Sequence, residues 1–208
     1  MARYTGPVCR ICRRYGEKLM LKGDKCVAKC TLDKRPQPPG AQQTGRRRKL
    51  SDRALQLREK QKARYSYGVL EKQFVQYYKD AVRQPGVTGQ NLVRLLEMRL
   101  DNVVLKMGFA DSLKQARQVV RHGHIMLNGR KTDVPSAATK PGDVIGWVAG
   151  SKKSEYYKFA QENIGSKSFP AWVNVDSGAM TGRIISHPDV ANMPTKFDPA
   201  VIVEYYSR

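Results

Sequence analysis

Hydrophobic positions between residues 111 and 131 predict a short helix followed by a β-hairpin. The apolar residues recur with the spacing of one buried helix face: they are Leu113, Ala116, Val119 and Val120. Asp111 or Ser112 can cap the start, because a short side-chain oxygen accepts hydrogen bonds from the free amides of the first turn. Gly123 is expected to end the helix, and Asn128-Gly129 predicts a two-residue hairpin turn, since both residues tolerate a positive φ.

Helical periodicity also predicts most of the chain before this segment. Helices are expected at residues 51–67, 70–82 and 88–98, followed by a shorter one at about 100–107. Ser51 or Asp52 can cap the first of them, and Gly68 ends it. The proline-rich residues 31–50 are expected to form an extended linker.

The chain after the hairpin alternates in a way that predicts strands around one helix. Strands are expected at residues 144–148, 172–175 and 182–185, and the last two can pair. Ser151 is expected to begin a helix that Gly165 ends. The final stretch, residues 200–208, fits either a strand or a docked helix, and its periodicity does not choose between them.

Composition adds an electrostatic constraint to this picture. The 208 residues carry a formal net charge of +20, and the pI is near 10.0. All of the excess lies in residues 1–131, because acidic and basic residues are equally numerous in the remainder. A field of this sign attracts polyanions through phosphate contacts. With no apolar run of about 20 residues and no secretory pattern, the sequence predicts a cytosolic protein with reduced thiols.

Positive charge gathers around the predicted helix and hairpin. Lys114, Arg117 and Arg121 share one helix face, while Arg130 and Lys131 begin the return strand. One basic helix face alone is commonly just solvated. A basic helix beside a basic hairpin is instead typical of a surface that holds folded nucleic acid.

Further basic residues extend the predicted surface towards the N-terminus. Residues 46–49 are four consecutive cations between two basic folded parts, which favours phosphate contact over simple solvation. The helix predicted at 51–67 carries five more cations. The residues expected to bind RNA are Arg46, Arg47, Arg48, Lys49, Arg53, Arg58, Lys60, Lys62, Arg64, Arg99, Lys114, Arg117, Gln118, Arg121, His122, His124, Asn128, Arg130 and Lys131.

Four cysteines near the N-terminus have the spacing of a metal site. Cys9, Cys12, Cys26 and Cys30 form the pattern C-x2-C-x13-C-x3-C, in which each close pair can present two thiolates to one ion. Four thiolates complete a structural Zn²⁺ site, and metal binding would supply folding free energy to this polar segment. An iron–sulfur cluster, which uses the same ligands, is the alternative. A reducing cytosol argues against two disulfides.

Several segments resemble one known family. Residues 99–131 resemble the RNA-binding module named after small-subunit ribosomal protein S-four. The segments MARYTGPVCRICRR, LQLREKQKARYSYGVLEKQF, VTGQNL, RLDNVV, ARQVVRHGHIMLNGR and EYYSR occur in order, and the chain resembles the bacterial S-four family over essentially its whole length. The cysteines match the metal-binding form of that family.

The resemblance implies an α+β fold in which a helical domain carries an inserted α+β domain. A small four-cysteine metal-binding segment with its linker would occupy residues 1–50. The helical domain would occupy residues 51–97, completed by residues 190–208, and the inserted domain residues 98–189. The RNA-binding module, two short helices plus a β-hairpin, would lie within residues 99–160.

The resemblance also implies a role and partners. Such a protein would be a structural, primary rRNA-binding constituent of the small ribosomal subunit, which binds a helix junction of the 5′ domain and nucleates assembly of the subunit body. Its further partners would be mRNA where it enters the subunit and the ribosomal proteins S-five and S-three, with an effect on translational accuracy through S-five. Residues 46–49 match the family's basic stretch near incoming mRNA.

Two other classes of protein are alternatives. An RNA-modifying enzyme with the same module would need a catalytic domain, for which the chain has no room, and no Ser–His–Asp set or pair of acids stands out. Asp101 is expected to orient Arg99 and not to do acid–base chemistry. A zinc-dependent mRNA-binding regulator outside the ribosome is compatible with the cysteines and the net charge. Preference for one structured rRNA at high salt would separate these classes.

Overall fold

The computed structural model describes residues 4–40, 49–190 and 192–207, which form two compact units. The first unit contains the described residues of Met1–Val93 and Pro194–Arg208. The second contains the described residues of Arg94–Met193. None of the described helices has the length and apolar character needed to cross a membrane.

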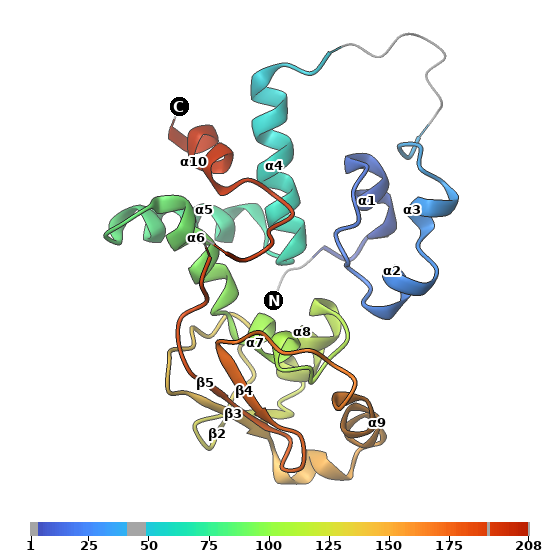
Figure 1. Ribbon diagram of the computed structural model, residues 1–208, viewed down its shortest axis with the longest axis vertical. Helices are drawn as coiled ribbons and strands as arrows, with labels where there is room; N and C mark the ends of the chain where they lie inside the picture. The colour runs from blue at the N-terminus through green and yellow to red at the C-terminus, as the bar shows by residue number, and fades with distance from the viewer. Residues whose placement is uncertain (1–3, 41–48, 191, 208) are drawn as a thin grey trace. The chain divides into compact units, whose positions relative to one another are not determined.

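The first unit is helical. Its elements are α1 (Cys9–Tyr15), α2 (Asp24–Ala28), α3 (Thr31–Lys34), α4 (Asp52–Ser66), α5 (Glu71–Arg83), α6 (Thr88–Glu97), whose last turn lies in the second unit, and α10 (Pro199–Ser207). The Ser51 hydroxyl accepts from the Ala54 amide at 3.3 Å and caps α4. The C-terminal segment is therefore a helix and not a strand, and α10 packs along α4 (Figure 1).

Buried apolar side chains from several helices stabilise this unit. Phe74, Leu92 and Ile202, from three different helices, are fully buried. Around α1 there is a smaller cluster, against which Tyr65 of α4 packs; its buried members are Val8, Ile11, Cys12, Tyr15 and Leu19. The extended linker predicted at 31–50 is wrong at its start, because Thr31–Lys34 forms a helical turn. Residues 41–48, which include Arg46, Arg47 and Arg48, lie outside the described residues.

The second unit combines helices with a sheet (Figure 1). Its elements are α7 (Leu100–Lys106), α8 (Leu113–Arg121), β1 (Ile125–Leu127), β2 (Arg130–Lys131), β3 (Val144–Trp147), the 3-10 helix η1 (Ala149–Lys153), α9 (Glu155–Ile164), β4 (Val173–Asp176) and β5 (Thr181–Ile184). The five strands run β2-β1-β3-β5-β4, and every neighbouring pair is antiparallel. The predicted mixture of helices and an antiparallel sheet is confirmed.

One core joins the helices of this unit to the sheet. Val104 of α7, Met107 directly after that helix and Val120 of α8 are buried in the same cluster as Ile145 and Trp147 of β3. α7 also packs directly on α8. The apolar side of α8 is therefore buried in the core, and the polar side of α8 remains for other contacts.

The local features predicted for the second unit are observed, with one exception. Asn128 and Gly129 have φ values of 50° and 77°, which confirms the predicted hairpin turn. The helix expected to start at Ser151 begins later, because η1 intervenes and Ser154 supplies the cap by accepting from the Tyr157 amide at 3.3 Å. The predicted pairing of the last two strands is confirmed, with Val175 opposite Gly182.

Candidate nucleic-acid interface

One face of α8 is exposed and basic. The Ser112 hydroxyl accepts from the Gln115 amide at 3.4 Å and fixes the first turn, as its sequence position predicts. Ala116, Val119 and Val120 are buried, so the opposite face must point outward. Its exposed members are Lys114, Gln118, Arg121 and His122.

The hairpin adds two more cations next to the end of α8. Arg130 and Lys131 of β2 are exposed. The aliphatic stem of Lys131 lies so close to Gly123 that a β-carbon there would overlap it. Gly123, with φ 73°, therefore ends the helix and also lets the hairpin approach it. We call Lys114, Gln118, Arg121, His122, Arg130 and Lys131 together the α8–hairpin surface.

Two histidines line this surface where the helix turns into the sheet. The rings of His122 and His124 are 6.0 Å apart. Partial burial, with smaller electrostatic effects of His122 and Lys131, lowers the pKa of His124 and so favours the neutral form of its ring. The Nδ1 atom of His124 is 2.9 Å from the Ser151 hydroxyl. A neutral ring held in this way can offer its other nitrogen to a ligand as a donor or an acceptor.

A cavity of about 310 Å³ opens beside the α8–hairpin surface. Its lining combines polar α8 side chains with an aromatic ring from α9: the residues are Gln115, Gln118, Val119, His122, His124 and Tyr156. Lys152 and Lys153 of η1 are exposed, and the bond from His124 to Ser151 brings their element next to this site. No periodicity marks these two lysines, so they are absent from the set of residues expected to bind RNA.

Asn128 serves the turn itself. Its side-chain amide donates to the Asp143 carboxylate at 2.9 Å and accepts from the Val144 amide at 2.8 Å. With both ends of the side chain engaged, the residue fixes the hairpin to the neighbouring strand. The structure therefore favours an indirect role for Asn128 in any RNA contact.

Arg99 and Arg117, which were expected to bind RNA, lie in the interior. Arg99 donates two hydrogen bonds to the buried Asp101 carboxylate, at 3.0 and 2.8 Å. The Arg117 guanidinium lies 3.8 Å from the same carboxylate. Both arginines are nearly inaccessible, so they brace α7 against α8 and do not form part of an open surface. The prediction that Asp101 orients Arg99 is confirmed.

Basic residues of α4 are also largely internal. Lys60 pairs with Glu71 at 2.7 Å, and Lys62 pairs with Glu17 at 2.6 Å and with Glu59 at 2.7 Å. Both lysines are buried. They are internal because α4 packs on α1 and on α10, and acidic residues from other elements meet its charges. This burial counts against direct phosphate contact by Lys60 and Lys62.

The other basic residues expected to bind RNA differ in their exposure and in the contacts they make within the protein. Arg53 is exposed, but it donates to the Tyr205 carbonyl and stacks on the Tyr205 ring. Arg58 donates to the Tyr15 carbonyl, and Arg64 lies over the Tyr65 ring. Lys49 is exposed. The cations of α4 are thus largely engaged in contacts within the first unit.

The four cysteines lie in the same small part of the first unit. Cys12, Cys26 and Cys30 are buried, and all four are free thiols. Burial raises the pKa of Cys12; a hydrogen bond from the Leu19 amide opposes this effect, and the proximity of the other three cysteines adds to it, so that the net pKa is raised. The Lys22 amide donates to the Cys26 sulfur at 3.3 Å. No three potential ligands among the described residues converge closely enough to hold a metal ion.

The fold and the α8–hairpin surface define the chain as an RNA-binding protein. Residues 3–97 match the family described as ribosomal protein S4/S9 N-terminal domain, and residues 98–145 match the S4 domain. The chain is 52% identical over 208 residues to small ribosomal subunit protein uS4 of Dehalococcoides mccartyi and 51% identical over 209 residues to that of Heliobacterium modesticaldum. Each match covers 100% of both chains. The protein belongs to the uS4 family of small ribosomal subunit proteins.

Proposed function

We propose that the protein binds a helix junction in the 5′ domain of small-subunit rRNA through its α8–hairpin surface and so nucleates assembly of the subunit body. As a uS4 protein it is a structural, rRNA-binding constituent of the cytoplasmic ribosome, and it is not an enzyme. The observation that carries the proposal is the exposed array on α8 and β2, which lies within the residues that match the S4 domain.

The mechanism is electrostatic and geometric. Exposed cations such as Lys114, Arg130 and Lys131 can neutralise phosphates that come close together where RNA helices meet. The neutral His124 ring beside them suits a base edge or a 2′-hydroxyl better than a phosphate. The buried Asp101 carboxylate pairs with Arg99 at the start of α7 and with Arg117 of α8, and so ties the two helices together; the array would therefore meet the RNA in one shape. Specificity would therefore come from the shape of the junction.

The test is binding of the full-length chain to 5′-domain rRNA and to a length-matched structured RNA. Both affinities are measured at moderate and at high salt. Tight binding that depends on the junction, with preference retained at high salt, is the expected result, because generic attraction fades with salt faster than a shape match does. Equal binding to both RNAs, lost together as salt rises, would overturn the proposal and favour an mRNA-binding regulator outside the ribosome.

We also propose that residues 46–49 contact mRNA where it enters the subunit and that the protein touches S-five and S-three. The support is the resemblance of this basic stretch to the family's, together with the exposure of Lys49. Small subunits assembled with the four cations changed to alanine should show weaker crosslinking to thiouridine-containing mRNA. Unchanged crosslinking, in subunits that contain the variant in full amount, would contradict the mRNA contact. An altered misreading rate in the variant subunits would connect the mRNA contact to translational accuracy.

For the cysteines we propose a structural Zn²⁺ site formed by Cys9, Cys12, Cys26 and Cys30. The support is the donor set, which suits zinc, and the amide donors that already point at two of the sulfurs. A bound cation would favour the thiolate forms that burial disfavours. Binding of one Zn²⁺ ion by all four cysteines would require their sulfur atoms to move closer together. An iron–sulfur cluster stays the alternative for the same ligands.

Elemental analysis of the purified full-length protein tests the proposed zinc site. About one zinc per chain is expected, falling on chelation and in Cys9→Ser and Cys26→Ser variants, which remove one ligand from each pair. Loss of metal should also reduce hydrogen-exchange protection in α1 and α2. A chain with no bound metal, or one with iron and visible absorbance, would rule out zinc.

A further inference from the structure

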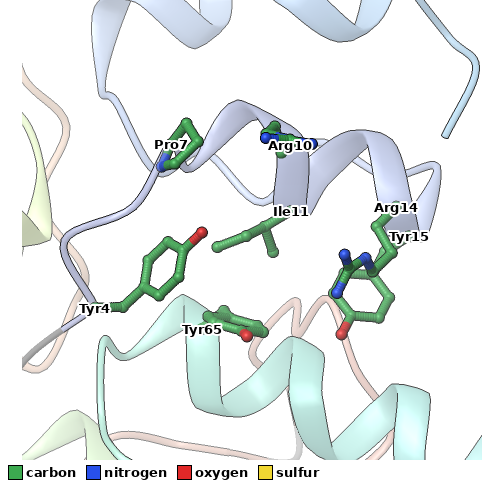
Figure 2. Close-up of a pocket in the computed structure, with 7 residues that line it drawn as sticks. All are labelled: Tyr4, Pro7, Arg10, Ile11, Arg14, Tyr15 and Tyr65. Atoms are coloured by element: carbon green, nitrogen blue, oxygen red, sulfur yellow. The ribbon is translucent and has the colours of Figure 1, made fainter. Parts of the chain in front are cut away.

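A second cavity, of about 330 Å³, lies in the first unit between α1 and α4 (Figure 2). Most of its lining is aromatic or cationic, namely Tyr4, Tyr15, Tyr65, Arg10 and Arg14, and Pro7 and Ile11 complete it. Figure 2 shows the rings of Tyr4 and Tyr65 beneath α1, with Ile11 extending towards them from the helix. None of these residues belongs to the RNA-binding set expected from the sequence.

The cations of this cavity are available to a ligand. Arg10 and Arg14 are exposed and lie one helical turn apart on α1, so they share a face. Among the described residues, neither guanidinium has a hydrogen bond or an ion pair. Arg13, on the same helix, differs: its Nε donates to the carbonyls of Arg35 and Gln37 and holds the segment that follows α3. On α1, therefore, Arg13 has a structural role, whereas Arg10 and Arg14 face solvent.

The aromatic rings are held in place by neighbours. Tyr4 and Tyr65 meet edge to face, with ring centroids 5.5 Å apart and planes at 73°. The Arg64 guanidinium lies over the Tyr65 ring, 4.4 Å from its centroid. A β-carbon at Gly6 would lie 2.6 Å from the Tyr4 hydroxyl, so the glycine makes room for that ring. Fixed rings lose little conformational entropy when a planar ligand stacks on them.

We propose that this cavity binds one unpaired nucleotide of the rRNA, with its base against the tyrosine rings and its phosphates at Arg10 and Arg14. The proposal rests on the rRNA binding proposed above and adds a second contact point to it. Aromatic rings beside a basic stripe are the usual arrangement for holding an unstacked base and its backbone. The volume is at the lower end of the range for small-ligand pockets, which suits one nucleotide.

An acidic protein segment is the other occupant that two arginines could attract. It would use the guanidiniums and would have no need of flat rings. The aromatic lining therefore favours a nucleotide, and substitutions at the rings separate the two occupants.

The test compares Tyr65→Leu with Tyr65→Phe in the full-length chain on 5′-domain rRNA. Tyr65→Leu should bind roughly tenfold more weakly than Tyr65→Phe, because only phenylalanine keeps a ring for base stacking. The double variant Arg10→Ala/Arg14→Ala should bind more weakly than the parent and lower the salt slope by about 0.7–0.9 per cation. Thiouridine-substituted rRNA should also crosslink to peptides that contain Tyr4 or Tyr65.

One control variant and one independent test variant keep the outcomes separate. Lys72→Ala/Lys79→Ala removes two exposed cations from α5 in the same unit and should leave the affinity within about twofold of the parent if location and not net charge matters. The double arginine variant leaves the cluster around α1 intact, so it tests the site even if Tyr65→Leu fails to fold. If the parent binds the rRNA tightly but the arginine variant matches it and crosslinks avoid both tyrosines, the nucleotide site is wrong. If the parent shows no rRNA preference, the proposed function itself fails.

Discussion

Asp101 is fully buried between the guanidinium groups of Arg99 and Arg117. A buried charge is tolerated only when it is paired and hydrogen-bonded, and here the carboxylate accepts two hydrogen bonds from Arg99 and forms a longer ion pair with Arg117. The same residue types at the surface contribute far less, since water screens them. Burial therefore decides which of the many cations in this chain stabilise the fold and which are available to a ligand.

Replacing Asp101 by alanine should destabilise the protein by about 3–5 kcal/mol, because two guanidiniums would stay buried without their carboxylate. The matched control is Asp133→Ala, whose carboxylate pairs with Arg121 at 3.2 Å on the surface. That variant should lose only about 0.2–1 kcal/mol. Urea denaturation measures both values, and similar losses in the two variants would contradict the role assigned to the buried cluster.

Glu71 links three helices of the first unit through its carboxylate. It accepts from Lys60 at 2.7 Å and from the Tyr206 hydroxyl at 2.8 Å. Burial raises the pKa of Glu71, but these hydrogen bonds and the nearby positive charge lower it by more, and the net pKa lies below its usual range. The ionised carboxylate is therefore more stable in the folded chain than in the unfolded one.

The stability that Glu71 contributes should depend on pH with a definite sign. It is fully present above the unfolded pKa, about 4.3 for glutamate, and is lost as the pH falls through the lower folded pKa. The difference in unfolding free energy between the parent and Glu71→Gln should thus shrink on acidification below about pH 4. Glu155→Gln, at an exposed site paired with Lys158, is the control, because an ion pair in solvent contributes little to stability. Denaturation of the parent and of both variants at a series of pH values measures these differences in unfolding free energy.

At the scale of elements, the hairpin depends on backbone conformation. Gly129→Ala should destabilise the protein by about 1–2 kcal/mol, because φ is 77° there and a β-carbon disfavours that region. Gly150→Ala is the matched control: a β-carbon would meet nothing within 4 Å at either position, but Gly150 has no positive φ. It should change stability by less than about 0.5 kcal/mol. Thermal unfolding of both variants measures the difference.

The elements whose ends are marked by a single local signal could be predicted from the sequence. Those for which two signals compete could not. Ser112, Gly123 and Asn128-Gly129 act within a few residues of themselves, so α8 and the hairpin follow from the sequence. The start of α9 does not, because Ser151 and Ser154 are both good caps and only the fold, which bonds Ser151 to His124, selects the second. The C-terminal helix was ambiguous for a similar reason, since its apolar run fits either structure.

At the scale of the whole molecule, the position of exposed charge should matter more than its amount. Changing Lys114, Arg130 and Lys131 to alanine should lower the salt slope of rRNA binding by about 0.7–0.9 per cation. The control removes the same charge from one face of α5, at Lys72, Lys79 and Arg83, and should change the slope much less. Equal changes in the two triple variants would mean that net charge alone drives binding.

The sequence by itself determined the family resemblance, the helix and hairpin next to each other, and the excess of positive charge in residues 1–131. These follow from local capping, turn chemistry and composition, which act over short stretches of chain. Only the tertiary structure decided that Arg99, Arg117, Lys60 and Lys62 are internal. Their carboxylate partners are brought to them mainly by packing of other helices and turns, and one-dimensional periodicity does not show which charged face a neighbour will cover.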